Sequence, residues 1–316
     1  MPDDTIREIA FSEYPITLRN IPHPPRKLFI RGRLPEDASI TSADMAGTAA
    51  ADVAAGTERK YLCIVGSRKW TTYGRDAVNK IVKGLKGYPI TIVSGLAIGI
   101  DSIAHMAALE AGLHCIAFPG SSLGWDELYP REHAHLGRKI VESGGALISQ
   151  WQSGYQMGKW AFPARNVLMA GISHATLIVE AGPRSGSLMT ARHAEEFDRD
   201  IFAVPGPITA SLSYGPHMLI RNGAALVSSS EDVLEALGFD VVRASAEVAA
   251  KLERDRLDAL DSLSTGILGI ISREDTSVEV LAEKLQTPSD ELMKKLSVME
   301  LEGYLKMSEG KVRKMQ

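Results

Sequence analysis

The chain has 316 residues, of which 45% are hydrophobic and 23% are charged, and its formal net charge is −4. These values are typical of a globular protein of about two domains. They exclude a broad basic surface, so any binding to nucleic acid must use a focused cationic patch. With only two cysteines, a disulfide framework is excluded, and no residues have the spacing of a zinc site.

The first ten residues, MPDDTIREIA, lack the apolar run of a signal peptide. No run of about 18 apolar residues occurs in the chain, so no membrane span is expected. We therefore expect a cytoplasmic protein. Cys63 and Cys115 lie within apolar runs, which favours buried thiols that act as small hydrophobic side chains.

Residues 1–60 are expected to form an N-terminal extension and a linker. Prolines interrupt the segment EYPITLRNIPHPP, and KLFIRG (27–32) is expected to be an edge strand. Residues 37–60 are rich in Ala, Thr, Gly and Ser and poor in large apolar residues, which favours an exposed loop.

Short apolar runs alternate with helical patterns over residues 61–240. The runs are YLCIVG, ITIVS, HCIAF, ALIS, ATLIVEA, DIFAVPG and AALVS. Runs of this kind suit strands that are buried on both faces. The alternation predicts an α/β domain of Rossmann type, with a parallel or mixed sheet and helices on both faces.

Several helix ends are marked by capping residues. Asp101 is expected to cap the helix through SIAHMAALEA, and Gly112 to end it. Ser230 is expected to precede the helix of EDVLEAL, and Gly238 to follow it.

Residues 241–260 carry many charges and are expected to be a linker to a last domain, 261–316. There the segments STGILGIIS, SVEVLAEKLQ and SDELMKKLSVMELEGYL predict three helices, and KMSEGKVRKM a hairpin. This order predicts a winged helix, with another small helical bundle as the alternative. Because the third helix is not basic overall, we expect it to contact protein or to regulate rather than to bind DNA.

Ligands bind open α/β sheets at the carboxyl ends of strands. After the first strand come Gly66, which allows a tight turn, Ser67, and Arg68, whose planar guanidinium suits phosphate oxygens. A simple tight turn with an exposed arginine is the alternative.

Two further loops carry glycine or small residues. Gly95 and Gly99 follow ITIVS and would let backbone amides point at an anion, or would serve close packing alone. Ser185, Gly186 and Ser187 stand at a helix start, where they can cap the helix or hold a phosphate.

The segment GKWAFPARN places cations and aromatic rings at the start of a helix, where Pro163 suits the first turn. Arg165 would face outward, Lys159 lies just before the helix, and Phe162 or Trp160 could support a stacked base. The alternative is a helix whose cations only extend into solvent. Together, the loops and this segment predict a phosphate-lined crevice with stacking groups.

No catalytic set is recognisable. The chain has neither GxSxG nor a P-loop, its histidines lack recognisable partners, and Asp101 and Glu180 lack a second carboxylate at a readable spacing. His105 is expected to pack within a helix. We therefore expect no enzyme activity, no cofactor and no metal.

Seven motifs in order resemble those of the DNA-processing protein A family, also called DprA or Smf. They are GSR (66–68), SGLAIGID followed by AH (94–105), FPARN (162–166), AGIS (170–173), EAGPRSGSLMTA (180–191), FAVPG (202–206) and SYGPHMLIRNGA (213–224). The resemblance is dense over about 60–240, and the tail is similar to the winged helix that many members carry.

This resemblance implies an extended Rossmann fold, a homodimer and binding of single-stranded DNA without strong sequence preference. It also implies help in loading the recombinase RecA during natural transformation and homologous recombination, without enzyme activity. By motif, Arg68 would contact phosphate, Lys159 would be a second cation contact, and Phe162 would stack on a base. Arg165, and with it Asn166 of FPARN, would line the same pocket.

The chain departs from the family pattern at three places. Val167 stands where the family usually has a second basic residue, which weakens the pocket's charge. Asp198 stands where a glycine is usual, so a local change of turn is expected. The segment 37–60 is longer than the pattern suggests.

Two other functions could use the same crevice: a sensor of a small nucleotide, or a nucleoside-monophosphate phosphoribohydrolase. The related phosphoribohydrolases carry PGGxGTxxE at the strand end. Here the corresponding stretch reads EAGPRSGSLMTA and lacks the acidic residue, which favours the DNA-binding hypothesis.

Overall fold

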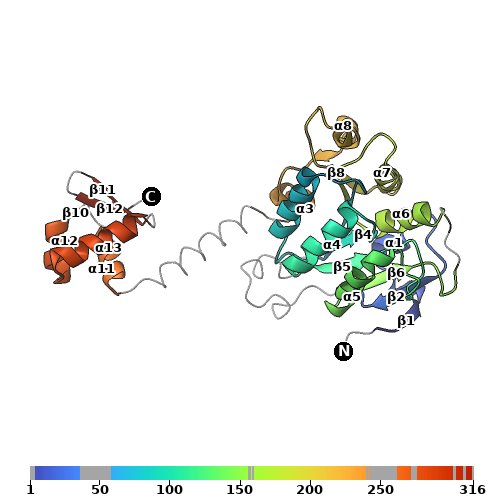
Figure 1. The fold of residues 1–316 in the computed structure, drawn as a ribbon, viewed down its shortest axis with the longest axis horizontal. Helices are drawn as coiled ribbons and strands as arrows, with labels where there is room; N and C mark the ends of the chain where they lie inside the picture. The colour runs from blue at the N-terminus through green and yellow to red at the C-terminus, as the bar shows by residue number, and fades with distance from the viewer. Residues whose placement is uncertain are drawn as a thin grey trace. The chain divides into compact units, whose positions relative to one another are not determined.

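The computed structural model of the chain describes residues 4–35, 58–155, 158, 160–239, 241, 262–271, 276–301, 304–308 and 311–314. Contacts divide the chain into two compact units, Met1–Ala244 and Ser245–Gln316 (Figure 1). The segment at 37–60 and the linker at 241–260 lie mostly outside the described residues, so the domain boundaries drawn from the sequence stay predictions.

A nine-stranded sheet in the order β1-β2-β6-β5-β4-β3-β7-β8-β9 forms the first unit. Strands β3 to β9 pair in parallel, and β2 pairs antiparallel with both β6 and β1. The strands are β1 (Ile6–Ile9), β2 (Leu28–Gly32), β3 (Lys60–Val65), β4 (Ile90–Ser94), β5 (His114–Ala117), β6 (Ala146–Ser149), β7 (Ala175–Ile178), β8 (Asp200–Ala203) and β9 (Ala225–Leu226). The strand order reverses at β3, where sheets of this kind bind ligands.

The prediction of an edge strand at KLFIRG is wrong in its position, because β1 pairs outside β2 and covers that edge. Residues 4–35 thereby extend the main sheet. The sequence around Ile9 shows no clear strand pattern. The strand β1 forms because it pairs with β2, and a strand is stable only when it has such a partner.

Side chains of β3 alternate between two hydrophobic cores. Leu62 and Ile64 pack in the core on one face of the sheet, whereas Cys63 and Val65 pack in the core on the other. This alternation confirms that the central strands are buried on both faces. Cys63 and Cys115 are both buried, as predicted.

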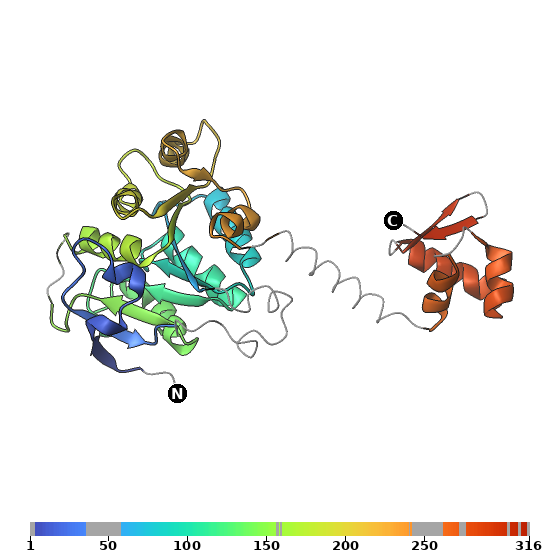
Figure 2. The same ribbon diagram turned by 180° about the vertical axis from the view of Figure 1, so that it is seen from behind.

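Helices cover both faces of this sheet, which confirms the predicted fold class. Those on one face are α3 (Thr72–Gly84), α4 (Ile100–Ala111), α5 (Ala134–Glu142) and α9 (Ser230–Ala236) (Figure 1). Those on the other are α1 (Ile16–Arg19), α6 (Ala161–Ile172) and α7 (Ser187–Glu196) (Figure 2). Helix α8 (Tyr214–Arg221) precedes β9, and the 3-10 turns are η1 (Phe11–Glu13), η2 (Arg131–His133) and η3 (Ser211–Ser213).

Two of the predicted helix N-caps are displaced along the chain, that of α4 by two residues and that of α9 by one. Gly99, with φ of +97°, precedes α4, so Asp101 stands inside the first turn and does not cap the helix. Ser229 caps α9, and Ser230 is the first helical residue. Gly112 ends α4 in a left-handed conformation, as predicted.

The described residues of the second unit form three helices and a three-stranded antiparallel sheet in the order β10-β12-β11. Its elements are α11 (Ser262–Ile271), β10 (Thr276–Ser277), α12 (Val278–Leu285), α13 (Ser289–Leu301), β11 (Leu305–Ser308) and β12 (Lys311–Lys314). This order is that of a winged helix, and its core includes Ile267, Leu281 and Leu296. The expected role of this second unit in contacting protein stays a prediction.

Of the helices in the described parts of both units, none combines the length and the apolar character that a membrane crossing requires.

Candidate nucleic-acid interface

A cavity of about 580 Å³ opens where the chain leaves β3 and β7 and enters three helices. It is lined by Val65, Gly66, Ser67, Arg68, Lys69, Ala97, Asp101, Phe162, Arg165, Asn166, Met169, Gly182, Pro183, Arg184, Ser185, Gly186, Ser187, Thr190 and Leu212. Most of the predicted binding residues are therefore brought together. Gly95 and Gly99 are not among the lining residues, and Lys159 lies outside the described residues.

The turn Gly66–Arg68 packs closely against the start of α4. A Cβ atom at Gly66 would lie 2.7 Å from Ile100 Cγ1, and the Ile100 amide donates a 3.2 Å hydrogen bond to the Ser67 carbonyl. Any side chain at position 66 would therefore force the turn away from the helix. Ser67 is buried and Arg68 is exposed, which leaves the arginine at the mouth of the cavity.

Helix α6 contributes Phe162, Arg165, Asn166 and Met169, whose spacing places them on one face of the helix. The prediction that Arg165 faces outward is wrong, because its residue is only 8% exposed. Its guanidinium donates to the Gly95 carbonyl at 2.5 Å and to Asn166 Oδ1 at 3.3 Å. These bonds replace water and make burial of the cation possible.

Gly95 is held from two sides. Its carbonyl accepts from Arg165, and its amide donates to Asp101 Oδ2 at 3.1 Å. The Gly95 amide thus points at a carboxylate of the protein itself and not at a ligand, and a Cβ atom at Gly95 would lie 2.2 Å from the Arg165 guanidinium, which favours the close-packing alternative for this glycine. Burial lowers the pKa of Arg165 and raises the pKa of Asp101, while the attraction between their charges opposes both shifts.

Phe162 lies between two other groups. The Arg68 guanidinium carbon lies 5.2 Å from the centre of the Phe162 ring, and the Tyr129 ring centre lies 5.7 Å from it at a tilt of 55°. The first contact is a cation–π interaction. A base that stacks on Phe162 must therefore either displace the Arg68 guanidinium or pack beside it.

The start of α7 forms the far wall. Asn166 Nδ2 donates to the Gly186 carbonyl at 3.3 Å, which ties this wall to α6. The Ser185 and Ser187 hydroxyl oxygens lie 2.7 Å apart, and Gly186 occupies the N-cap position. The Ser185 hydroxyl does accept a 3.4 Å hydrogen bond from the Ser187 amide at the helix start, which supports the capping alternative for Ser185, and the phosphate contact stays a prediction.

The lining is cationic on balance. Arg68, Lys69, Arg165 and Arg184 face one carboxylate, Asp101. Within the described part of the chain, no ion pair involves Arg68, Lys69 or Arg184. Neither Lys69 nor Arg184 was named as a binding residue from the sequence, although Lys69 adjoins the GSR motif and Arg184 lies within EAGPRSGSLMTA, where it favours a phosphate contact.

Two departures from the family pattern have a visible place. Val167 packs against the core and does not line the cavity, and the weaker charge expected from its replacement of a basic residue stays a prediction. Asp198 has φ of +54°, in the left-handed region that favours glycine, just after α7. Asp198 thus keeps a backbone conformation that suits the family's usual glycine, and the expected change of turn stays a prediction.

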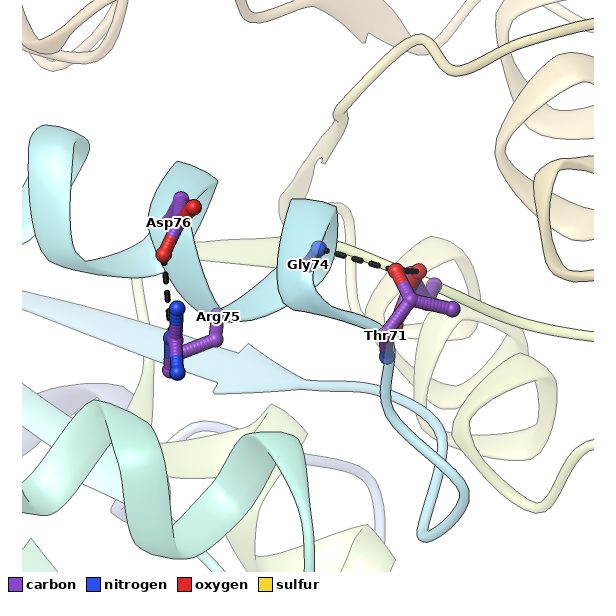
Figure 3. A network of polar contacts seen from close by, with 5 residues as sticks. Thr71, Gly74, Arg75 and Asp76 are labelled. Atoms are coloured by element: carbon purple, nitrogen blue, oxygen red, sulfur yellow. Dashed lines mark hydrogen bonds and ion pairs between the residues drawn. The ribbon is translucent and has the colours of Figure 1, made fainter.

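The start of α3 is anchored to the sheet by Glu180, which follows β7. Thr71 accepts a hydrogen bond from the Gly74 amide at 3.2 Å and so caps the helix, and Arg75 pairs with Asp76 at 2.9 Å (Figure 3). The Thr71 amide donates to Glu180 Oε2 at 3.0 Å, and its hydroxyl donates to Oε1 at 2.5 Å. Glu180 is 5% exposed, so its buried carboxylate has the structural role of holding the start of α3.

Several buried titratable groups of the first unit are engaged in packing. Asp101 and Glu180 both hold backbone amides, and burial lowers the pKa of His105 to about 3. Burial also raises the pKa of the Cys115 thiol to about 12. In the ranges that the structure describes, no three His, Cys, Asp or Glu side chains gather as metal ligands would.

Residues 52–238 match the family model of DNA recombination-mediator protein A. The Smf protein of Escherichia coli is 39% identical over 245 residues, which cover 77% of this chain and 65% of that protein. The DNA processing protein DprA of Streptococcus pneumoniae is 43% identical over 178 residues, which cover 56% of this chain and 62% of that protein. The chain thus spans less than two thirds of the length of either relative.

Two solved structures share the fold. The X-ray structure of DprA from S. pneumoniae has a TM-score of 0.61 and 35% identity, and the match covers 76% of each chain. A structure of DprA from Helicobacter pylori, solved for its single-stranded DNA binding mode, has a TM-score of 0.59 and 24% identity over 75% of this chain and 98% of that one. The chain belongs to the DNA recombination-mediator protein A family.

Proposed function

We propose that the chain binds single-stranded DNA in the cavity, without strong sequence preference, and acts as a recombination mediator. The observation that carries this proposal is the gathering of four cations and one carboxylate around a single cavity. Membership of the family supports the recombination role. In this proposal the protein is a cytoplasmic homodimer that helps to load RecA in natural transformation and homologous recombination, and it is not an enzyme.

Each part of the cavity has a proposed task. The exposed cations Arg68, Lys69 and Arg184 attract the phosphates, and Lys159 is proposed as a further contact. Ser185, Gly186 and Ser187 offer hydroxyl and amide donors at the start of α7. Phe162 supplies a ring for one base. Phosphates and ring faces are common to all nucleotides, so such contacts give little sequence preference.

Replacement of Arg68 by alanine tests this proposal. Because charge-assisted contacts to phosphate are strong, we expect Arg68→Ala to weaken binding of a thymidine oligonucleotide about tenfold or more. The slope of log affinity against log salt should also fall by roughly 0.7, the value for one lost phosphate contact on a single strand. Fluorescence anisotropy over a salt series measures both.

Arg7→Ala is the matched control, because Arg7 lies on β1 and pairs with Glu13 at 2.8 Å, away from the cavity lining. Its binding should equal that of the natural chain. If Arg68→Ala and Lys159→Ala both bind the oligonucleotide like the natural chain, the cavity is not the DNA site.

The cavity volume also suits a small ligand, because pockets for such ligands measure about 300–1,000 Å³. A nucleotide sensor is therefore the second candidate. Competition with thymidine monophosphate separates the two: a DNA-binding protein releases the labelled oligonucleotide only at a large excess of mononucleotide, whereas a sensor releases it at equal concentration. Release of free base would instead reveal the phosphoribohydrolase.

A further inference from the structure

Three aromatic side chains gather just before α6, outside the cavity lining. The rings of Trp151 and Tyr155 are stacked, with centres 4.3 Å apart and an angle of 11° between planes. The Trp160 ring lies 4.8 Å from the first at 88° and 5.5 Å from the second at 83°. Trp160 is nevertheless 56% exposed, so the cluster is only partly buried.

This geometry determines which face of Trp160 is covered. Two stacked rings that are both perpendicular to a third ring, and both close to it, can meet it only through their edges and on one of its faces. Edge-to-face contacts of this kind fix the orientation of the indole. Trp151 and Tyr155 thus leave the opposite face of Trp160 uncovered, while Gly158 approaches the indole near Nε1, and 56% of the residue is exposed.

Phe162 offers less room for a base than Trp160 does. Its ring is half-buried and is flanked by Arg68 and Tyr129. Trp160 stands two residues before Phe162 and occupies the N-cap position of α6, the helix that lines one side of the cavity. A strand that passes Phe162 therefore reaches the open face of Trp160 within a few nucleotides.

We propose that the open face of Trp160, supported by Trp151 and Tyr155, is a second base-stacking site for the same single strand, outside the cavity. The occupant is an unpaired nucleobase, because every base has a flat π-face that can cover an indole. This inference rests on the proposed function, since the cavity cations supply the phosphate contacts that hold the strand beside the cluster.

The test compares two strands of the same length: an oligothymidine, and a strand of abasic sugars that keeps every phosphate. The natural chain should prefer the strand with bases. In Trp160→Ala, affinity for oligothymidine should fall about 5- to 150-fold, the range for loss of one stacked base. Affinity for the abasic strand should stay unchanged, so the ratio between the two strands should fall by the same factor.

Two variants serve as controls. Trp160→Phe keeps a ring and should retain most of the affinity for oligothymidine. Ile208→Ala removes another large apolar side chain that is 92% exposed, and its affinity for both strands should match that of the natural chain.

The outcomes separate this inference from the proposed function. If Arg68→Ala weakens binding but Trp160→Ala leaves the ratio between the strands unchanged, the stacking site is refuted and the cavity proposal stands. If Trp160→Ala weakens binding of both strands equally, the tryptophan acts on the phosphate path or on folding, which also refutes the stacking site. If the natural chain binds neither strand, both proposals fail.

Discussion

At the scale of single residues, the cavity depends on glycines that bring backbone segments close together. Gly99 has φ of +97°, and a Cβ atom there would lie 2.3 Å from the Ser67 carbonyl oxygen and 2.8 Å from Arg68 Cα. Both atoms belong to the backbone of the turn that carries Arg68, so the clash cannot be relieved by a side-chain rotation. Gly99 does not line the cavity, but it lets the start of α4 approach the turn that carries Arg68.

We therefore expect Gly99→Ala to lower the free energy of unfolding by at least about 2 kcal/mol, through backbone strain and the displaced turn. Binding of single-stranded DNA should weaken as well, because Arg68 moves with the turn. Gly112→Ala is the matched control: its φ is +72°, yet nothing lies within 4 Å of its Cβ position. It should show strain of about 1–2 kcal/mol and normal DNA binding. Equal losses in the two variants would contradict the explanation.

At the scale of elements, α3 and β7 are coupled through one threonine and one buried carboxylate. Thr71 caps α3 and also donates its amide and hydroxyl hydrogens to Glu180. A Cβ atom at Gly74 would lie 2.3 Å from Glu180 Oε2, so the first turn of the helix leaves space for this carboxylate. The helix that follows the GSR turn is thereby fixed to the neighbouring strand.

Thr71→Ala should lower the free energy of unfolding by about 1–2 kcal/mol, because it removes the cap and one hydrogen bond to Glu180. Thr71→Ser keeps the hydroxyl and should cost much less. Urea unfolding followed by tryptophan fluorescence measures this in the first unit, since Trp70, Trp125, Trp151 and Trp160 all lie within Met1–Ala244. A serine variant as unstable as the alanine variant would show that the hydroxyl is not responsible.

At the scale of the whole molecule, three histidines are held neutral by packing. Burial is the main cause that lowers the pKa of His105 to about 3 and those of His114 and His174 to about 4. The His174 ring stacks on Tyr61, and its Nδ1 accepts from the Tyr61 amide at 3.0 Å, which requires an unprotonated nitrogen. In the folded first unit these three histidines therefore stay unprotonated at pH values where they would bind a proton in the unfolded chain.

The sign of the pH dependence follows from these shifts. Their folded pKa values lie below the ordinary 6.5, so the unfolded state binds more protons, and stability falls as the pH drops below about 6.5 toward 4. Between pH 7 and pH 5.5 we expect a loss of roughly 1 kcal/mol per histidine. Urea unfolding at both pH values measures it, and equal stability at the two would refute the prediction.

Local patterns were sufficient for the fold class and for most of the cavity lining. The apolar runs at 61–65, 90–94 and 175–178 form the central strands, because side chains buried on both faces leave a continuous signal in the sequence. The turn with Arg68 and the start of α7 were found because parallel strands end at one edge of a sheet, which brings their loops together. Both features depend on neighbours along the chain.

The orientation of particular side chains was decided by tertiary structure. Arg165 points inward because its partner is the carbonyl of Gly95, 70 positions away. Asp101 accepts from the amide of that same residue instead of capping its helix. Phe162 is flanked by Arg68 and Tyr129, whereas Trp160 is 56% exposed. The sequence by itself determined which elements form and where their loops meet, since periodicity and turn residues are local. Which side chain is buried or exposed depended on contacts between distant segments, because those contacts exist only after the sheet has assembled.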